Sequence, residues 1–214
     1  MSDLSGNKLE IDFRGGRALA GGRIRFLGSF PGRVPICGLP EIAFAGRSNV
    51  GKSSAINRLL ECKKAARVSS TPGRTQAINL FAVEQRIAFA DLPGYGFAKV
   101  PAAVQRGWKS LVEGYLAERA ELRLVVLLLD PRRKPQELDA DLIWGLRQAG
   151  IPLLVLATKM DKIPRSKRLS ALSTLRKAYA LKPHEALSFS SLDGIGLAEA
   201  WEIFERAVAP GGEE

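Results

Sequence analysis

The sequence predicts an α/β fold in which a mostly parallel, six-stranded sheet carries helices on both faces. From Glu41 onward, short apolar runs that suit buried strands alternate with longer stretches of helical periodicity. This alternation is typical of a parallel sheet, because each crossover helix returns the chain to the same end of the sheet. The 214 residues suffice for one such domain with its own core.

The expected elements alternate along the chain. Strands are expected at Glu41–Ala45, Ile78–Val83, Arg86–Ala90, Leu124–Leu129, Pro152–Ala157 and Glu185–Ser190. Helices are expected at Lys52–Cys62, Ala102–Arg119, Pro135–Ala149, Arg165–Ala180 and Leu197–Ala209. Because only Glu84 and Gln85 separate the second strand from the third, these two strands form an antiparallel hairpin and the sheet is mixed. Trp108 and Trp201 lie on expected helices, and we interpret both as core or half-core residues rather than as stacking platforms.

The segment before Glu41 differs from the rest of the chain. It is rich in Gly and Arg, carries six basic and three acidic residues, and shows no long helical period. We interpret residues 1–38 as a basic N-terminal extension with a strand around Arg23–Phe30. Residues 39–209 are expected to form the globular domain, and residues 210–214 a flexible tail.

Composition limits the class of protein. Apolar residues make up 46% and charged residues 25%, and runs such as Leu124–Leu129 are far too short to cross a bilayer. The N-terminus lacks the apolar region of a signal peptide, and the two cysteines show no metal-ligand spacing. We therefore expect a cytoplasmic protein, a monomer, without membrane insertion. The net charge of +10 favours a polyanionic partner, nucleic acid before an anionic membrane, over an ordinary solvated basic surface.

The segment GRSNVGKS, residues 46–53, fits the pattern G-x-x-x-x-G-K-[ST] between an expected strand and an expected helix. Gly46 permits a tight turn, and Gly51 lets backbone N–H groups approach phosphate oxygens. Lys52 is placed to reach the β- and γ-phosphates, and the Ser53 hydroxyl suits Mg²⁺. The pattern predicts a phosphate-binding loop, since the strand–loop–helix context disfavours a chance glycine-rich turn.

Two further loops follow expected strands. In FADLPGYGF, residues 89–97, Asp91 ends an apolar run and Gly94 completes D-x-x-G, the pattern with which nucleotide-hydrolysing proteins sense a terminal phosphate. In TKMD, residues 158–161, the Asp161 carboxylate can accept hydrogen bonds from the guanine N1–H and N2 amino group, a donor pair that adenine lacks. TKMD alone is weak and could be a charged loop, but the order of the three loops predicts a guanine-nucleotide site.

These three loops, in this order, resemble those of the translation-factor class of GTPases. The stretches TPGRTQAINLF at residues 71–81, DLPGYGFAKV at 91–100, TKMDK at 158–162 and FSS at 189–191 resemble the EngB (YihA/YsxC) family, over about residues 36–208. The resemblance implies a Ras-like P-loop domain that binds GTP and GDP with Mg²⁺ and hydrolyses GTP to GDP and phosphate slowly. It also implies a role in assembly of the large ribosomal subunit, with ribosomal RNA or a subunit precursor as partner, and in normal cell division and septation.

The resemblance also assigns roles to residues. Ser53, Thr75 and Asp91 would hold Mg²⁺, Thr75 only when GTP is bound, and the Gly94 amide would touch the γ-phosphate. Ser190 and Ser191 would give backbone contacts to the guanine O6. The nucleotide-contacting set is Gly46, Arg47, Ser48, Asn49, Val50, Gly51, Lys52, Ser53, Ser54, Gly73, Arg74, Thr75, Gln76, Ala77, Asp91, Leu92, Pro93, Gly94, Thr158, Lys159, Met160, Asp161, Phe189, Ser190 and Ser191.

Tyr95 stands where many GTPases carry the Gln that orients the attacking water. A phenol is poorly equipped for that work, so we expect Tyr95 to pack and hydrolysis to be slow without a partner or potassium. The expected catalytic groups are Lys52, Thr75, Gly94 and Asn49. In related GTPases an Asn at this P-loop position holds a potassium ion that replaces an arginine finger, although Asn49 bracing the loop is an equal alternative.

Other interpretations remain open. A metabolic P-loop kinase would need an acceptor pocket and a lid and would not need TKMD. A switch that acts on a division protein or a membrane surface would use a basic face just as an RNA-binding switch does. Thr158 replaces the commoner Asn and removes one amide that could brace its loop, so modest base affinity is expected. The basic groups are Lys63, Lys64, Arg67 and Arg74; Lys99, Arg106 and Lys109; Arg132, Arg133 and Lys134; and Lys159, Lys162, Arg165, Lys167 and Arg168.

Overall fold

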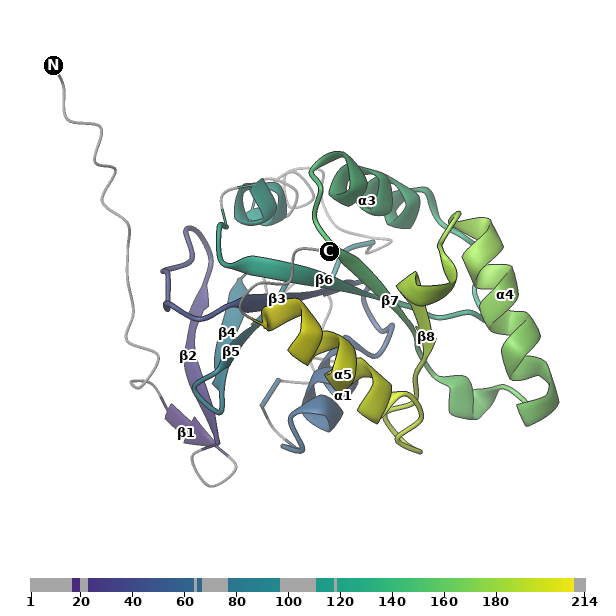
Figure 1. Ribbon diagram of the computed structural model, residues 1–214, viewed down its shortest axis with the longest axis horizontal. Helices are drawn as coiled ribbons and strands as arrows, with labels where there is room; N and C mark the ends of the chain where they lie inside the picture. Colours follow the sequence, from purple (N-terminus) through teal and green to yellow (C-terminus); the bar gives the residue numbers. More distant parts are fainter. Residues whose placement is uncertain are drawn as a thin grey trace, which may run out of the picture.

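The computed structural model describes residues 17–19, 23–63, 65–66, 77–96, 111–117 and 119–209. One eight-stranded sheet forms its centre, with strand order β1-β2-β4-β5-β3-β6-β7-β8 (Figure 1). The strands are β1 (Arg17–Leu19), β2 (Ile24–Phe30), β3 (Glu41–Gly46), β4 (Ile78–Val83), β5 (Ile87–Asp91), β6 (Leu122–Leu129), β7 (Leu153–Ala157) and β8 (Ala186–Ser188). The helices are α1 (Lys52–Leu59), α3 (Glu137–Gln148), α4 (Arg168–Ala178) and α5 (Leu197–Val208), with residues 111–117 also helical.

The parallel core of the sheet has the predicted arrangement. Strand β3 pairs in parallel with β5 and β6, β6 pairs with β7, and β7 pairs with β8. Every residue of β3 is buried, as expected for a central strand covered on both faces. Because these strands run in the same direction, the loops that follow them meet at one edge of the sheet.

The hairpin is also confirmed. Strands β4 and β5 pair antiparallel, with Val83 opposite Ile87. Glu84 and Gln85 have φ angles of 49° and 56°, the positive values of a tight primed turn that matches the twist of the two strands. The sheet is therefore mixed, and the expected α/β fold with a mostly parallel sheet is correct.

The number of strands differs from the prediction. Six strands were expected in the sheet, and the described residues form eight. Strand β2 is the one expected around Arg23–Phe30, and it pairs antiparallel with β4, while β1 pairs antiparallel with β2. The physical reason is that β4 would otherwise be an open edge with unpaired backbone groups, which β2 covers.

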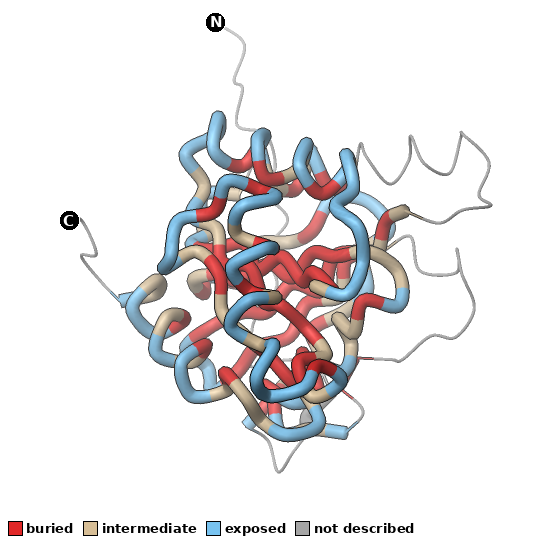
Figure 2. The backbone as a smooth tube through the Cα atoms, turned by 90° about the vertical axis from the view of Figure 1, so that its right-hand side faces the viewer, coloured by how far each residue is buried: buried red, intermediate tan, exposed pale blue. Residues whose placement is uncertain are grey.

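The core lies on both faces of the sheet. Figure 1 shows α3 on one face and α1 with α5 on the other, and in Figure 2 the buried residues concentrate at the centre with exposed residues around them. Alternate residues of β3 face opposite ways: Ile42 and Phe44 pack in the cluster with α1 and α5, and Ala43 and Ala45 in the cluster with α3 and α4.

Two differences in the helices have local causes. Residues Arg165–Lys167 form a separate 3₁₀ turn after the extended Pro164, so α4 begins at Arg168 rather than at Arg165. Trp201 on α5 is half-buried, stacks on Phe89 with ring centroids 5.7 Å apart, and donates its indole N–H to the Leu59 carbonyl at 3.2 Å. It packs against the core as a half-buried residue, within the prediction of a core or half-core position, whereas Trp108 lies outside the described residues.

A buried ionic network fixes the start of β3. Glu41 is 0% exposed, forms an ion pair with Arg119 and accepts a hydrogen bond from the Tyr115 hydroxyl at 2.6 Å. Arg119 also donates to the carbonyls of Val34 at 2.8 Å and Pro35 at 2.9 Å. Such a buried pair tolerates loss of neither partner, because the remaining charge would be uncompensated. Among the described helices, none combines the length and apolar character that crossing a membrane requires.

Candidate nucleotide-binding site

The loop after β3 has the geometry of a phosphate cradle. A Cβ on Gly46 would lie 2.9 Å from Val50 Cγ1 and 3.1 Å from the Leu128 carbonyl oxygen, so no larger residue fits there. Gly51 has φ 108°, a value that favours glycine, and forms the N-terminal boundary of α1 without a side-chain cap. The first N–H groups of α1 therefore need another acceptor, and together with the positive end of the helix dipole they favour an anion.

Two charged side chains meet beside this cradle. The Lys52 ammonium group forms an ion pair with Asp91 Oδ1, and the Asn79 amide lies 3.4 Å from Asp91 Oδ2. The Asp91 side chain is only 7% exposed, so its charge requires such partners. Sequence reasoning did not identify Asn79, whose place on β4 opposite Asp91 depends on strand register.

These residues fit a magnesium site. Asp91 at the end of β5 and Ser53 in the first turn of α1 offer a carboxylate and a hydroxyl, the oxygen ligands that Mg²⁺ prefers. No group of three His, Cys, Asp or Glu side chains that could hold a metal ion occurs within the described part of the chain. This donor set suits Mg²⁺, which is usually bound by one or two protein ligands together with substrate phosphates and waters.

The D-x-x-G loop lies directly against the P-loop. The Ser48 N–H donates to the Tyr95 carbonyl at 3.0 Å, and the Tyr95 N–H donates to the Gly46 carbonyl at 3.4 Å. A Cβ on Gly94 would come within 3.2 Å of Ser48 Oγ. The two loops that were expected to share the terminal phosphates are thus joined by backbone hydrogen bonds.

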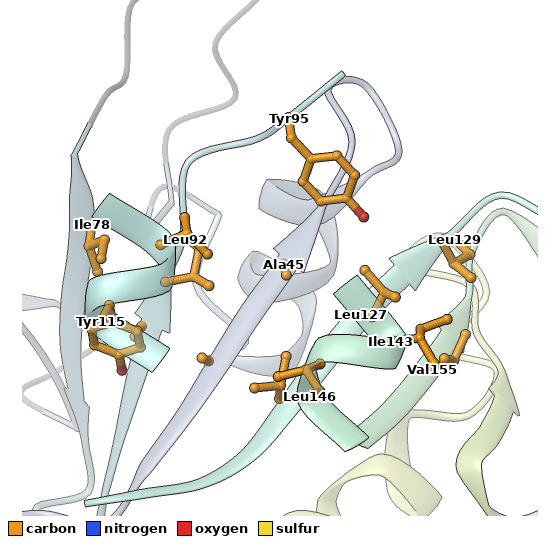
Figure 3. Packing of buried hydrophobic residues seen from close by; sticks show 14 of the residues in the cluster. Ala45, Ile78, Leu92, Tyr95, Tyr115, Leu127, Leu129, Ile143, Leu146 and Val155 are labelled. Carbon is orange, nitrogen blue, oxygen red and sulfur yellow. The ribbon is translucent and has the colours of Figure 1, made fainter. Parts of the chain in front are cut away.

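Tyr95 is a packing residue, as its chemistry predicted. It is 4% exposed, and Figure 3 shows its ring among the buried side chains of one core cluster. Its hydroxyl donates to Asp139 Oδ1 at 2.7 Å. Burial, followed by the negative charge of Asp139, raises the pKa of Tyr95 well above its ordinary value, so the hydroxyl stays protonated. Sequence reasoning missed Asp139.

The Thr158 hydroxyl joins the base loop to the P-loop. It donates to the carbonyl oxygens of Val50, at 2.9 Å, and Leu129, at 3.2 Å. The hydroxyl thus braces the base loop against the P-loop and the end of β6, and the modest base affinity expected from the loss of the Asn amide stays a prediction. The next residue, Lys159, adopts a left-handed conformation with φ 58° and donates from Nζ to the Asn49 carbonyl at 2.7 Å.

The Asp161 carboxylate, which was expected to select guanine, is oriented by the last loop. Ser190 Oγ donates to Asp161 Oδ1 at 2.8 Å and accepts the N–H groups of Leu192, at 3.2 Å, and Asp193, at 3.1 Å. The other oxygen of Asp161 has no hydrogen-bond partner among the described residues. The TKMD and FSS motifs are therefore joined through the Ser190 side chain, while the Ser190 N–H donates to the Ile195 carbonyl at 3.0 Å.

Several predicted contact residues lie in the core. Met160 and Phe189 are 0% exposed, and the Met160 N–H donates to the Phe189 carbonyl at 3.2 Å, so their side chains position the loops. Leu92 and Pro93 are buried too. Gly73, Arg74, Thr75 and Gln76 lie outside the described residues, and Ala77 directly precedes β4.

Sequence reasoning also missed Asp130, which directly follows β6 at the same edge of the sheet. Its side chain is 1% exposed and is held by Arg132, at 2.7 Å, and by Lys159, at 3.3 Å. Burial alone would raise the pKa of Asp130, but the hydrogen bonds from Arg132 and the charges of Arg132 and Lys159 outweigh burial and lower it to about 2. The sequence signal that could have identified Asp130 is its position directly after an apolar strand.

The site belongs to a known group of proteins. Residues 41–159 match a family model described as 50S ribosome-binding GTPase. A relative from Geobacter metallireducens, named probable GTP-binding protein EngB, is 46% identical over 87% of this chain and 92% of its own. A relative of the same name from Pelotomaculum thermopropionicum is 48% identical over 83% of this chain and 90% of its own.

Solved structures agree with these relatives. The crystal structure of a probable GTP-binding protein EngB is 26% identical to this chain and superposes with a TM-score of 0.65, covering 78% of this chain and 98% of that one. A structure of Era bound to MgGDPNP and a 16S ribosomal RNA fragment shares the fold, at 22% identity and a TM-score of 0.65, over 82% of this chain and 59% of that one. The chain therefore belongs to the EngB family of GTP-binding proteins and is a P-loop GTPase.

Proposed function

We propose that this GTPase is a nucleotide-dependent switch that acts in assembly of the large ribosomal subunit, with ribosomal RNA or a subunit precursor as its partner. The observation that carries the proposal is a group of exposed cations beside the base loop. We call them the base-loop cations: Arg133, Lys134, Lys162, Arg165 and Lys167.

The base-loop cations are available for a polyanion. All five are exposed, and within the described residues none of their side chains forms a hydrogen bond or an ion pair, whereas the side chain of their neighbour Arg132 is held by Asp130. They lie on the loops after β6 and β7, which are adjacent because these strands pair in parallel and Lys159 reaches Asp130. Uncompensated cations on one edge are what a phosphate backbone requires.

The nucleotide would be held by the loops at the same edge. Lys52 and the N–H groups at the start of α1 would bind the β- and γ-phosphates, and the Gly94 amide would contact the γ-phosphate. Ser53, Thr75 and Asp91 would hold Mg²⁺, which neutralises charge that develops on the phosphates. Asp161, oriented by Ser190, would select guanine.

Catalysis would need help from outside these residues. Tyr95 is buried and its hydroxyl is engaged by Asp139, so it does not orient a water. Asn49 is exposed in the P-loop with φ 65°, where its side-chain oxygen would hold a potassium ion near the phosphates. We therefore propose slow intrinsic hydrolysis that potassium or a ribosomal partner accelerates.

The remaining parts of the proposal concern the whole chain. The GTPase domain would comprise residues 39–209, preceded by a basic extension of residues 1–38 and followed by a tail of residues 210–214. The protein would act as a cytoplasmic monomer, and the cell-division and septation role linked to the family would follow from its effect on ribosomes.

Co-sedimentation with ribosomal particles tests the proposal. The protein should sediment with large-subunit particles more strongly with a GTP analogue than with GDP, and the association should weaken steeply with salt. Arg165→Glu with Lys167→Glu should weaken it at least tenfold. The control, Lys177→Glu with Arg206→Glu, reverses the same number of exposed charges on α4 and α5 and should have little effect. Equal losses in both pairs, or salt-independent binding, would contradict an RNA contact at the base-loop cations.

A further inference from the structure

A buried carboxylate connects the D-x-x-G loop to two helices. Asp139 lies in the first turn of α3 and is 3% exposed. Its Oδ1 accepts the Tyr95 hydroxyl at 2.7 Å, and its Oδ2 accepts the Tyr179 hydroxyl at 3.1 Å. Tyr95 directly follows Gly94, and Tyr179 directly follows α4. Both oxygens of one buried carboxylate are therefore used to hold two tyrosines that come from different parts of the chain.

A second connection reaches the same turn of α3 from the P-loop. The Arg47 guanidinium donates to Gln136 Oε1 at 2.8 Å and to the Gly96 carbonyl at 3.3 Å. Gln136 directly precedes α3, and its N–H donates to the Tyr179 hydroxyl at 3.0 Å. The start of α3 is therefore joined to the P-loop as well as to the residues that follow Gly94.

These contacts fix the peptide next to Gly94. The Tyr95 backbone bonds to the P-loop through Ser48 and Gly46, while its side chain bonds to Asp139. Gly94 packs closely against the P-loop: a Cβ there would be 3.2 Å from Ser48 Oγ and 3.5 Å from the Gly46 carbonyl oxygen. Movement of the Gly94 amide away from the P-loop would have to break the contacts of its neighbour.

We propose that Asp139 is a positioning residue for GTP: it holds Tyr95, and through Tyr95 it keeps the Gly94 amide at the P-loop, where it meets the γ-phosphate. The inference rests on the proposed contact between Gly94 and the γ-phosphate. Asp139 itself does not touch the nucleotide. GDP lacks the γ-phosphate, so its binding gains nothing from this arrangement.

A purely structural role for Asp139 makes a different prediction, and the chain offers two controls. Tyr179 donates to the same carboxylate but is not part of the D-x-x-G loop. Tyr115 donates to the buried carboxylate of Glu41 at 2.6 Å, the same chemistry at the opposite end of β3. If these hydroxyls only stabilise the fold, Phe at any of the three positions should affect GDP and GTP binding alike.

Calorimetry with GDP and with a non-hydrolysable GTP analogue provides the test. Tyr95→Phe should weaken the analogue about fivefold and leave GDP affinity within about 1.5-fold, as expected for loss of one net hydrogen bond. Tyr179→Phe and Tyr115→Phe should leave the ratio of the two affinities unchanged. Asp139→Asn should weaken the analogue in the wild-type background and add nothing in the Tyr95→Phe background, because it acts through Tyr95.

Two further measurements separate the possible failures. Thermal denaturation of each variant verifies that it is folded. Equal effects on GDP and the analogue in Tyr95→Phe would overturn the inference. If Gly94→Ala weakens the analogue and Tyr95→Phe does not, only the inference fails, and if Gly94→Ala has no effect, the proposed role of Gly94 fails with it.

Discussion

Asp161→Asn is expected to change which base this GTPase prefers. In the structure Asp161 Oδ1 is occupied by Ser190 Oγ at 2.8 Å, and the second oxygen is left for the base. The substitution places an amide NH₂ or a neutral carbonyl opposite two guanine donors. A hydrogen bond to a charged group contributes about 1.5–3 kcal/mol, so GDP should bind about 10- to 100-fold more weakly. Xanthosine diphosphate should gain affinity, because the carbonyl that replaces the guanine 2-amino group accepts a hydrogen bond from the new amide.

Calorimetric titration of both nucleotides into wild type and variant measures this change. Ser190→Ala is the matched control, since it removes the group that orients Asp161 and keeps the charge. The GDP affinity of Ser190→Ala should fall only about fivefold, with no gain in affinity for xanthosine diphosphate. Unchanged GDP affinity in Asp161→Asn would refute the assignment of Asp161 to guanine, and ATP that binds as tightly as GTP would favour a kinase.

Three other predictions concern switching, catalysis and stability. Thr75→Ala should leave GDP affinity nearly unchanged but abolish GTP-dependent sedimentation with ribosomal particles. If this variant still sediments more strongly with a GTP analogue than with GDP, Thr75 is not the switch residue. Single-turnover GTP hydrolysis should be faster in potassium than in sodium, and Asn49→Ala should cancel the difference. Equal wild-type rates in the two salts would instead indicate that a partner supplies the missing catalytic group. The pKa of Asp130 is about 2, below its ordinary 3.8. The ionised carboxylate therefore contributes about 2 kcal/mol above pH 4 that is lost as the pH falls towards 2. Denaturant titrations should show a smaller pH dependence over this range in Asp130→Asn, and identical profiles would contradict this account.

The sequence predicted the elements that depend on local pattern. Apolar runs located the parallel strands, the two-residue gap at Glu84 and Gln85 located the hairpin, and glycine and lysine spacing located the P-loop. These features are visible because they depend on residues close together in the chain. The number of strands in the sheet was harder to predict, because β1 is only three residues long and its pairing depends on β2.

Contacts between distant residues could not be predicted in the same way. Asp139 has the place of an ordinary first-turn acid, which suits the helix dipole, and only the packing of α3 brings it to Tyr95, 44 residues away. The role of Ser190 as a side chain, and the reach of the Thr158 hydroxyl to Val50, likewise depend on how the loops meet. Motifs indicated which loops form the site, and tertiary packing determines which side chains orient them.

The bond from Thr158 to Val50 has a consequence for synthesis of the chain. It joins residues 108 positions apart, and β3 lies between strands made much later. A chain emerges at about 5–20 residues per second, so the phosphate loop exists for several seconds before the base loop is made. On the proposed role of Asp161, a nascent chain should acquire guanine specificity only after β7 and β8 have joined the sheet. Free guanine nucleotide should therefore favour the last stage of folding, because it binds the completed fold and not its earlier intermediates.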